Sequence, residues 1–171
     1  MQIFASTTFH GTGPVALAEP LAMLSDIGLD GVELGSTHRW QADIQSDIRR
    51  LWSKPLITHN YFPPAKDDLV LNIASLDPDV RMRSIEHMKF CLAFAADIGA
   101  ILYTIHPGFL AEPKAAGTDV AARKFDFQFD GVTAPYEKAF ALMVDALKDL
   151  VDTASDLGVR LAIETEGSLT S

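Results

Sequence analysis

One local pattern recurs three times along this chain and constrains its fold more than any other feature. Each time, a stretch of helical periodicity ends in Asp-Ile-Gly or Asp-Leu-Gly, and a β-rich apolar run follows within a few residues. The three glycines are Gly28, Gly99 and Gly158. Glycine just past a helix end can adopt the left-handed conformation that closes the helix, and a short link to an apolar run is typical of turns from helix to strand in parallel sheets. The pattern therefore predicts a chain built from repeated βα units.

Five short apolar runs alternate with four helical stretches, and such runs are typical of strands buried on both faces of a parallel sheet. The expected strands are 2–6, 31–34, 55–59, 101–106 and 159–164, and the expected helices are 15–27, 42–52, 78–98 and 135–157. Two helices have a start signal, with Asp77 as an N-cap before Pro78 and Pro135 in a first turn. Strands alternating with helices leave two α/β architectures, an eight-fold barrel or an open doubly wound sheet.

Two connections are unusually long, and both follow expected strands rather than helices. They span residues 61–75 and 109–134. Within the second, residues 124–131 alternate strictly between polar and apolar, which predicts a short β-ribbon or lid with one aromatic face. Loops after parallel strands emerge at the carboxyl edge of the sheet, where such folds place their active sites. We expect a binding site there; a cover over the barrel mouth or a dimer contact is the alternative.

The composition bounds the class of protein and its partners. With 171 residues, 48% hydrophobic and 22% charged, the chain is in the ordinary range for one globular domain. Its longest apolar runs are too short to span a membrane, and its N-terminus lacks the features of a secretory signal, so we expect a cytoplasmic protein with no membrane partner. A net charge of −9 opposes binding to a phosphate backbone, so no nucleic acid partner is expected. The single cysteine, Cys91, allows no intrachain disulfide and is expected to be a buried packing residue.

Four titratable residues fall at the ends of successive expected strands. They are Glu33, His59, His106 and Glu164. Because the carboxyl ends of parallel strands meet on one face, these side chains should converge, and imidazole plus carboxylate is the ligand set for Zn, Mn, Fe or Co. The sequence therefore predicts a metal or acid/base site, although Glu33 could instead cap the segment that follows it.

At these residues the chain resembles the xylose isomerase-like barrels, a family that includes endonuclease IV and many sugar isomerases and epimerases. The resemblance is carried by Gly31-Val32-Glu33-Leu34-Gly35, His59 with Tyr61, Ile105-His106-Pro107-Gly108, and Ala162-Ile163-Glu164 with Gly167. It implies a (β/α)8 TIM barrel, of which residues 1–171 supply the N-terminal part of a single domain, about the first five βα units. Two departures concern substrate contact: Thr165 stands where the family often has Asn, and Tyr61 follows His59 by two residues, whereas many relatives have the Tyr three residues on.

The resemblance also implies the roles of the strand-end residues. His106 and Glu164 would bind a divalent metal such as Zn, Mn, Mg or Co, joined by His59 as in the endonuclease IV-like branch. In the isomerase and epimerase branch, the Glu of the fifth strand is both a ligand and the base that moves a proton beside the sugar carbonyl, a role that falls on Glu164. The expected substrate contacts are His10, Glu33 and Tyr61.

Three functions from different classes follow. The leading prediction is a metal-dependent sugar or sugar-phosphate isomerase or epimerase with a carbohydrate substrate. The second is an endonuclease IV-like phosphoester hydrolase, which the pair His59 and His106 favours and the net charge opposes for DNA. The third is a non-catalytic barrel or half-barrel used for assembly. Because a complete barrel needs about 250 residues and eight strands, we expect a fragment of a longer protein, a cleaved product, or a half that pairs with another chain. The expected partner is the missing C-terminal half of the barrel or a second copy in a homo-oligomer, and we expect the chain to be inactive when it is alone.

Overall fold

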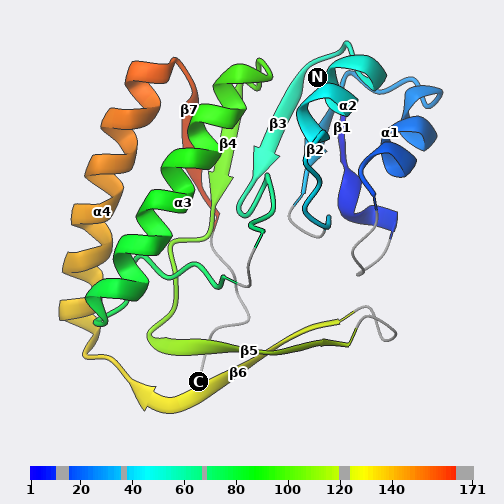
Figure 1. Ribbon diagram of the computed structural model, residues 1–171. Helices are drawn as coiled ribbons and strands as arrows, with labels where there is room; N and C mark the ends of the chain where they lie inside the picture. The colour runs from blue at the N-terminus through cyan, green and yellow to red at the C-terminus, as the bar shows by residue number, and fades with distance from the viewer. Residues whose placement is uncertain (11–15, 36–37, 67–68, 120–123, 165–171) are drawn as a thin grey trace.

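The computed structural model describes residues 1–10, 16–35, 38–66, 69–119 and 124–164, and within them a five-stranded sheet forms the centre of the fold (Figure 1). The strands are β1 (Phe4–Ser6), β2 (Gly31–Leu34), β3 (Leu56–His59), β4 (Leu102–Ile105) and β7 (Arg160–Ile163). They lie side by side in that order, and every neighbouring pair is parallel. Each strand falls inside the range expected for it from the sequence, so these predictions are confirmed.

One α-helix follows each of the first three strands in sequence, after a long connection in the case of β3, and the fourth α-helix follows β4 after a two-stranded insertion. They are α1 (Ala18–Ser25), α2 (Ile44–Leu51), α3 (Pro78–Asp97) and α4 (Tyr136–Leu157), and a short 3-10 helix, η1 (Thr7–His10), precedes α1. Strand order here increases steadily, so right-handed crossovers place every helix on the same face of the sheet. An open doubly wound sheet needs a reversal of strand order, so the fold is the barrel type, represented here by five of its strands.

The predicted helix ends are visible in the backbone. The Asp77 carboxylate caps α3 by accepting hydrogen bonds from the N–H groups of Asp79 and Val80, at 2.9 and 3.4 Å. The sequence predicted Pro135 within the first turn of the fourth helix. In the structure α4 begins one residue later, at Tyr136, and Pro135 is its N-cap. Gly99 and Gly158 have φ angles of 72° and 68° at the ends of α3 and α4, which confirms the prediction that they close these helices in the left-handed region. Gly28 also has a positive φ, of 24°, but α1 ends at Ser25 with Asp26 as its C-cap, so Gly28 does not close that helix.

The two faces of the sheet are buried to different degrees. Side chains alternate between faces along a strand, and on β3 and β4 the residues of one face are buried while those of the other are half-buried. The outer face, which packs against the helices, includes Leu56, Thr58, Tyr103 and Ile105. The inner face, which would face the axis of a closed barrel, includes Ile57, His59, Leu102 and Thr104. Among the described elements, the helices cover the outer face.

The long connection after β4 forms an antiparallel ribbon of β5 (Ala111–Asp119) and β6 (Lys124–Thr133). The ribbon is longer than the sequence predicted, and Figure 1 shows it crossing the molecule beyond the carboxyl ends of the strands. Glu112 ties it to the β3–α3 connection, because its carboxylate accepts hydrogen bonds from Asn72 and Ser75. Most of the side chains of the expected aromatic face lie outside the described ones; Phe129 is described and packs near Phe109, with ring centroids 5.5 Å apart.

The core lies between the outer face and the helices. Its largest buried side chains include Tyr103, Met88, Leu92 and Leu150. Cys91 is buried among them, and burial raises the pKa of its thiol to about 12, which confirms the prediction of a packing residue. Within the described part of the chain, no helix is both long and apolar enough to cross a membrane.

Candidate metal centre

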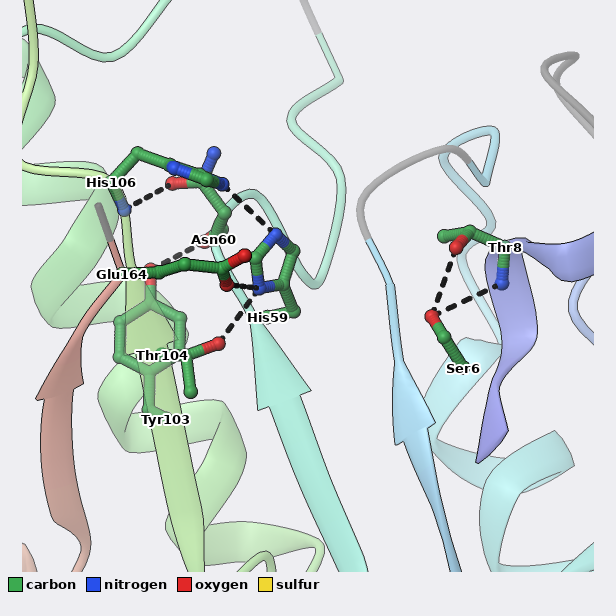
Figure 2. A network of polar contacts seen from close by, with 8 residues as sticks. All are labelled: Ser6, Thr8, His59, Asn60, Tyr103, Thr104, His106 and Glu164. Atoms are coloured by element: carbon green, nitrogen blue, oxygen red, sulfur yellow. Dashed lines mark hydrogen bonds and ion pairs between the residues drawn. The ribbon is translucent and has the colours of Figure 1, made fainter. Parts of the chain in front are cut away.

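Three of the four predicted strand-end residues meet on the inner face. His59 is the last residue of β3, His106 follows β4 by one residue, and Glu164 follows β7 by one residue. Potential ligand atoms of the three side chains all lie within 4.8 Å of one another (Figure 2). The N–H of Glu164 donates to the carbonyl of Ile105 at 2.9 Å, which holds the end of β7 against the end of β4. The structure therefore brings together two imidazoles and a carboxylate.

The two imidazoles present the same nitrogen to each other. Nε2 of His59 lies 3.1 Å from Nε2 of His106, and the rings are nearly perpendicular, at 87° with centroids 4.9 Å apart. Two nitrogens that bind one zinc ion at about 2.0–2.1 Å each must lie within about 4 Å of one another. The distance between these two atoms satisfies that limit, and the donor set suits zinc or a related transition metal.

The other edge of the His59 ring has two oxygen neighbours. Nδ1 of His59 lies 2.7 Å from Oγ1 of Thr104 and 3.4 Å from Oε2 of Glu164. The exposed fractions of the side chains differ: His59 is 16% exposed and Glu164 is 54% exposed. The centre thus combines a shielded imidazole with a carboxylate that solvent or a small molecule can reach.

Asn60 connects the centre to the buried side of the sheet. Its backbone takes a left-handed conformation with φ of 48°, its N–H donates to the carbonyl of Thr104 at 2.7 Å, and its carbonyl accepts from the buried hydroxyl of Tyr103. Its side-chain Oδ1 lies 3.5 Å from the N–H of His106, which donates to it. Sequence reasoning missed Asn60, although an asparagine directly after a strand is one of the residues that most readily adopts positive φ.

Among the described residues, the cluster of possible ligands includes none of the other predicted site residues. Glu33 is the third of four residues in β2, not at its end, and its register partners are Ser6 and Ile57 on the neighbouring strands. The hydroxyl of Tyr61 accepts a hydrogen bond from the N–H of Leu71 at 3.0 Å. His10 ends η1, and its side chain lies outside the described ones. Substrate contact by Glu33, Tyr61 and His10 stays a prediction.

Steric crowding explains why glycine occupies two positions of the sequence motifs. A Cβ at Gly35 would overlap the Thr8 side chain, so the end of β2 and the segment after β1 can approach only with glycine there. Gly108, after His106 and Pro107, has φ of 118°, and a Cβ would overlap Oδ1 of Asn72, which accepts hydrogen bonds from the backbone N–H groups of Phe109 and Ala74. These glycines let the chain pack tightly around the strand ends.

Comparison with known protein families finds one that matches most of this sequence. The model of the family described as xylose isomerase-like TIM barrel matches residues 21–170. No curated protein matches the sequence at a significant level.

Solved structures of similar fold point the same way. One is a D-tagatose 3-epimerase-like protein, 18% identical, with a TM-score of 0.66, where the match covers 96% of this chain and 53% of that protein. A second is the D-psicose 3-epimerase of Clostridium cellulolyticum with D-tagatose, 11% identical, with a TM-score of 0.71 and coverage of 100% and 54%. A third is a Thermus thermophilus protein soaked with zinc chloride, 24% identical, with a TM-score of 0.58 and coverage of 95% and 54%. At these identities the likeness establishes the fold, and the chain spans about half the length of each protein.

Proposed function

This chain belongs to the xylose isomerase-like TIM barrel family, and we propose that it supplies the metal-binding part of a metal-dependent sugar or sugar-phosphate isomerase or epimerase. The observation that carries the proposal is the convergence of His59, His106 and Glu164 at the carboxyl ends of three adjacent strands. In this proposal, residues 1–171 are the N-terminal part of one barrel domain, and the remaining strands lie in further sequence or in another chain.

The side chains that would hold a divalent cation are His59, His106 and Glu164. A divalent cation bound there would act as a Lewis acid that polarises a substrate carbonyl. Glu164 is suited to a second task because its carboxylate is more than half exposed, so it can reach a proton on the carbon beside that carbonyl. A carboxylate placed in this way can remove the proton and return it, which is the step that isomerisation and epimerisation share.

The substrate class is proposed from the family and from the inner face. Solved structures of the same fold include a D-tagatose 3-epimerase-like protein and a D-psicose 3-epimerase with D-tagatose, names that point to ketoses. Polar groups on the inner face of this chain extend beyond the candidate metal ligands to Glu33 and to the hydroxyls of Ser6 and Thr8 (Figure 2). The oxygens of these two hydroxyls lie 2.9 Å apart. Hydroxyls and carboxylates of this kind are suited to hydrogen bonds with a polyol. We propose Glu33, Tyr61 and His10 as further substrate contacts.

A phosphoester hydrolase of the endonuclease IV type is the second candidate. The observation that favours it is the pair of imidazoles that present Nε2 atoms 3.1 Å apart, because two histidines and a carboxylate form a common zinc hydrolase ligand set. The net charge of −9 opposes a nucleic acid substrate but not a small phosphoester. A non-catalytic half-barrel is the third candidate, and it predicts no bound metal.

The first test is the metal content of the purified chain. We expect about one divalent ion per chain in the wild type and its loss in the double variant His106→Ala, Glu164→Ala. The matched control is Glu86→Ala, His87→Ala, which removes the same two chemical groups from α3, away from the cluster. Zinc at 100 times its dissociation constant should stabilise the wild type and the control by about 2.7 kcal/mol, and it should leave the double variant unchanged.

A second measurement separates the two enzymatic candidates. Incubation of ketoses in deuterated water should place deuterium on the carbon beside the carbonyl if the protein is an isomerase or epimerase. Release of inorganic phosphate from small phosphoesters without deuterium exchange would instead support the hydrolase. A chain that binds no metal would contradict the metal site and favour the assembly role. Absence of both activities from the 171-residue chain by itself is expected if the remaining strands complete the active site, so the activity assays are decisive on the complete barrel.

A further inference from the structure

We propose that Thr104 is a positioning residue that holds the His59 ring as its Nδ1–H tautomer and thereby directs the Nε2 lone pair toward His106. This inference rests on the proposed function, because it concerns how the chain prepares a ligand for a cation. Thr104 lies on β4, two residues before His106, which follows the strand. Neither its sequence position nor the family resemblance assigns it a role.

The neighbours of Nδ1 decide which nitrogen carries the proton. Oγ1 of Thr104 lies 2.7 Å from Nδ1 of His59, and Oε2 of Glu164 lies 3.4 Å from the same atom. An ionised carboxylate only accepts hydrogen bonds, whereas a hydroxyl can accept or donate. A lone pair on Nδ1 would face the carboxylate oxygen unfavourably, so the arrangement favours a proton on Nδ1, and Thr104 then accepts it. A neutral imidazole carries one N–H, which leaves Nε2 as the acceptor.

The far side of the ring is consistent with this assignment. Nε2 of His59 is the atom that faces Nε2 of His106, at 3.1 Å. With a lone pair on Nε2, His59 can accept a hydrogen bond from His106 in the absence of a cation or act as a ligand in its presence. The same side chain orientation therefore serves both states without rotation of the His59 ring.

Thr104 is suited to this task by its place in the sheet. It is the register partner of His59 on the adjacent parallel strand, and both side chains point to the inner face. Its backbone carbonyl accepts the N–H of Asn60 at 2.7 Å, so the strand that carries the hydroxyl is fixed to the segment that carries the imidazole. A β-branched side chain has little freedom about its first torsion. If Glu164 binds a cation, Thr104 remains as the acceptor for the Nδ1 proton.

The expected size of the effect follows from other metal sites. Groups that accept the second N–H of a ligating histidine fix its orientation and increase its basicity, and their loss typically lowers metal affinity by about 10- to 100-fold. We expect a loss in this range for zinc when Thr104 is replaced by valine, which has nearly the same shape and no hydroxyl. Thr104→Ser retains the hydroxyl and should restore both the tautomer and the affinity.

The decisive experiment is made on the metal-free chain. Long-range proton–nitrogen correlation spectra distinguish the two tautomers of His59 at a pH above its titration range. We expect Nδ1–H in the wild type and in Thr104→Ser, and a shift toward Nε2–H in Thr104→Val. The matched control is Thr58→Val, which removes a hydroxyl from the neighbouring position of β3 on the outer face and should leave the tautomer unchanged.

Zinc titration of the same four proteins completes the test. A wild type that shows Nε2–H, or a Thr104→Val variant that keeps both the tautomer and the zinc affinity of the wild type, would overturn the role of Thr104. A wild type that shows the expected tautomers but binds no zinc would overturn the proposed metal function while supporting the role of Thr104 in orienting His59. If Thr104→Val does not fold, Nε2–H in the wild type or in Thr104→Ser would still overturn the role of Thr104.

Discussion

The outer and inner faces of the central sheet carry different kinds of residue. On β3 and β4 the outer face is fully buried and includes Thr58, Tyr103 and Ile105. The inner face of the same strands is half-buried and carries His59 and Thr104 among its apolar residues. Because adjacent residues on a strand alternate between these faces, stability and chemistry are encoded in alternate positions of the same short segments.

This division explains how short strands can hold a polar centre in place. The hydroxyl of Tyr103 donates to the carbonyl of Asn60, and Asn60 in turn accepts the N–H of His106 on the inner side. The buried face thus determines the backbone positions from which the ligands project. Predictions that change one face at a time can test how independent the two faces are.

The largest expected effect comes from truncating an isoleucine on the outer face. Ile105 is fully buried, so Ile105→Ala should lower the free energy of unfolding by about 2–5 kcal/mol through lost burial and the cavity that remains. Ile57 is half-buried on the inner face, so Ile57→Ala should cost about half as much or less. Urea denaturation of both variants and the wild type measures the difference.

The same two variants can also contradict the view that the inner face is less buried than the outer face. Equal losses for Ile57→Ala and Ile105→Ala would mean that the inner face is covered in solution. The cover would be another copy of the chain or further sequence of the barrel, and sedimentation of the 171-residue chain would distinguish the first case. A monomer with unequal losses would support an open inner face in the chain by itself.

A smaller effect is expected at Asn60, which links the two faces. Alanine at a positive φ costs about 1–2 kcal/mol, and Asn60→Ala also removes the acceptor for the His106 N–H. Asn60→Gly tolerates the backbone angle and should cost less than Asn60→Ala. Thermal unfolding of the two variants separates the backbone contribution from the side-chain contribution. Equal costs for both would show that the hydrogen bond, rather than the left-handed backbone, determines the role of Asn60.

The sequence was sufficient for the strands and helices of the central sheet and for the convergence of three of the four strand-end residues, whereas Glu33 lies within β2 rather than at its end. Apolar runs located every strand of the sheet, three of them shortly after a glycine that follows a helix, and parallel strands necessarily bring their carboxyl ends together. The positioning residues were not predicted because they depend on register. Thr104 contacts His59 only because the two are partners across β3 and β4. The length of the β5–β6 ribbon was also underestimated, since only its second strand alternates strictly in sequence.

The smallest expected effect concerns His87, a histidine of the helical layer that contrasts with the histidines of the inner face. Burial lowers the pKa of His87 below its usual value, and a backbone hydrogen bond to Tyr61 only partly opposes this shift. Among the described residues, its Nε2 has no hydrogen-bond partner. The folded chain therefore holds this imidazole neutral where the unfolded chain would protonate it.

The sign of the pH dependence follows from that difference. Above the pKa of the unfolded state, about 6.5, both states are neutral and stability is unaffected; as the pH falls below it, the unfolded state binds the proton first and stability is lost. His87→Asn keeps a polar side chain but does not titrate, so its stability should fall less than that of the wild type between about pH 7 and 5. The difference cannot exceed the slope of one proton, about 1.4 kcal/mol per pH unit. Denaturation curves at several pH values measure this difference. If the wild type and His87→Asn lost the same stability between about pH 7 and 5, burial would not lower the pKa of His87 in the folded chain.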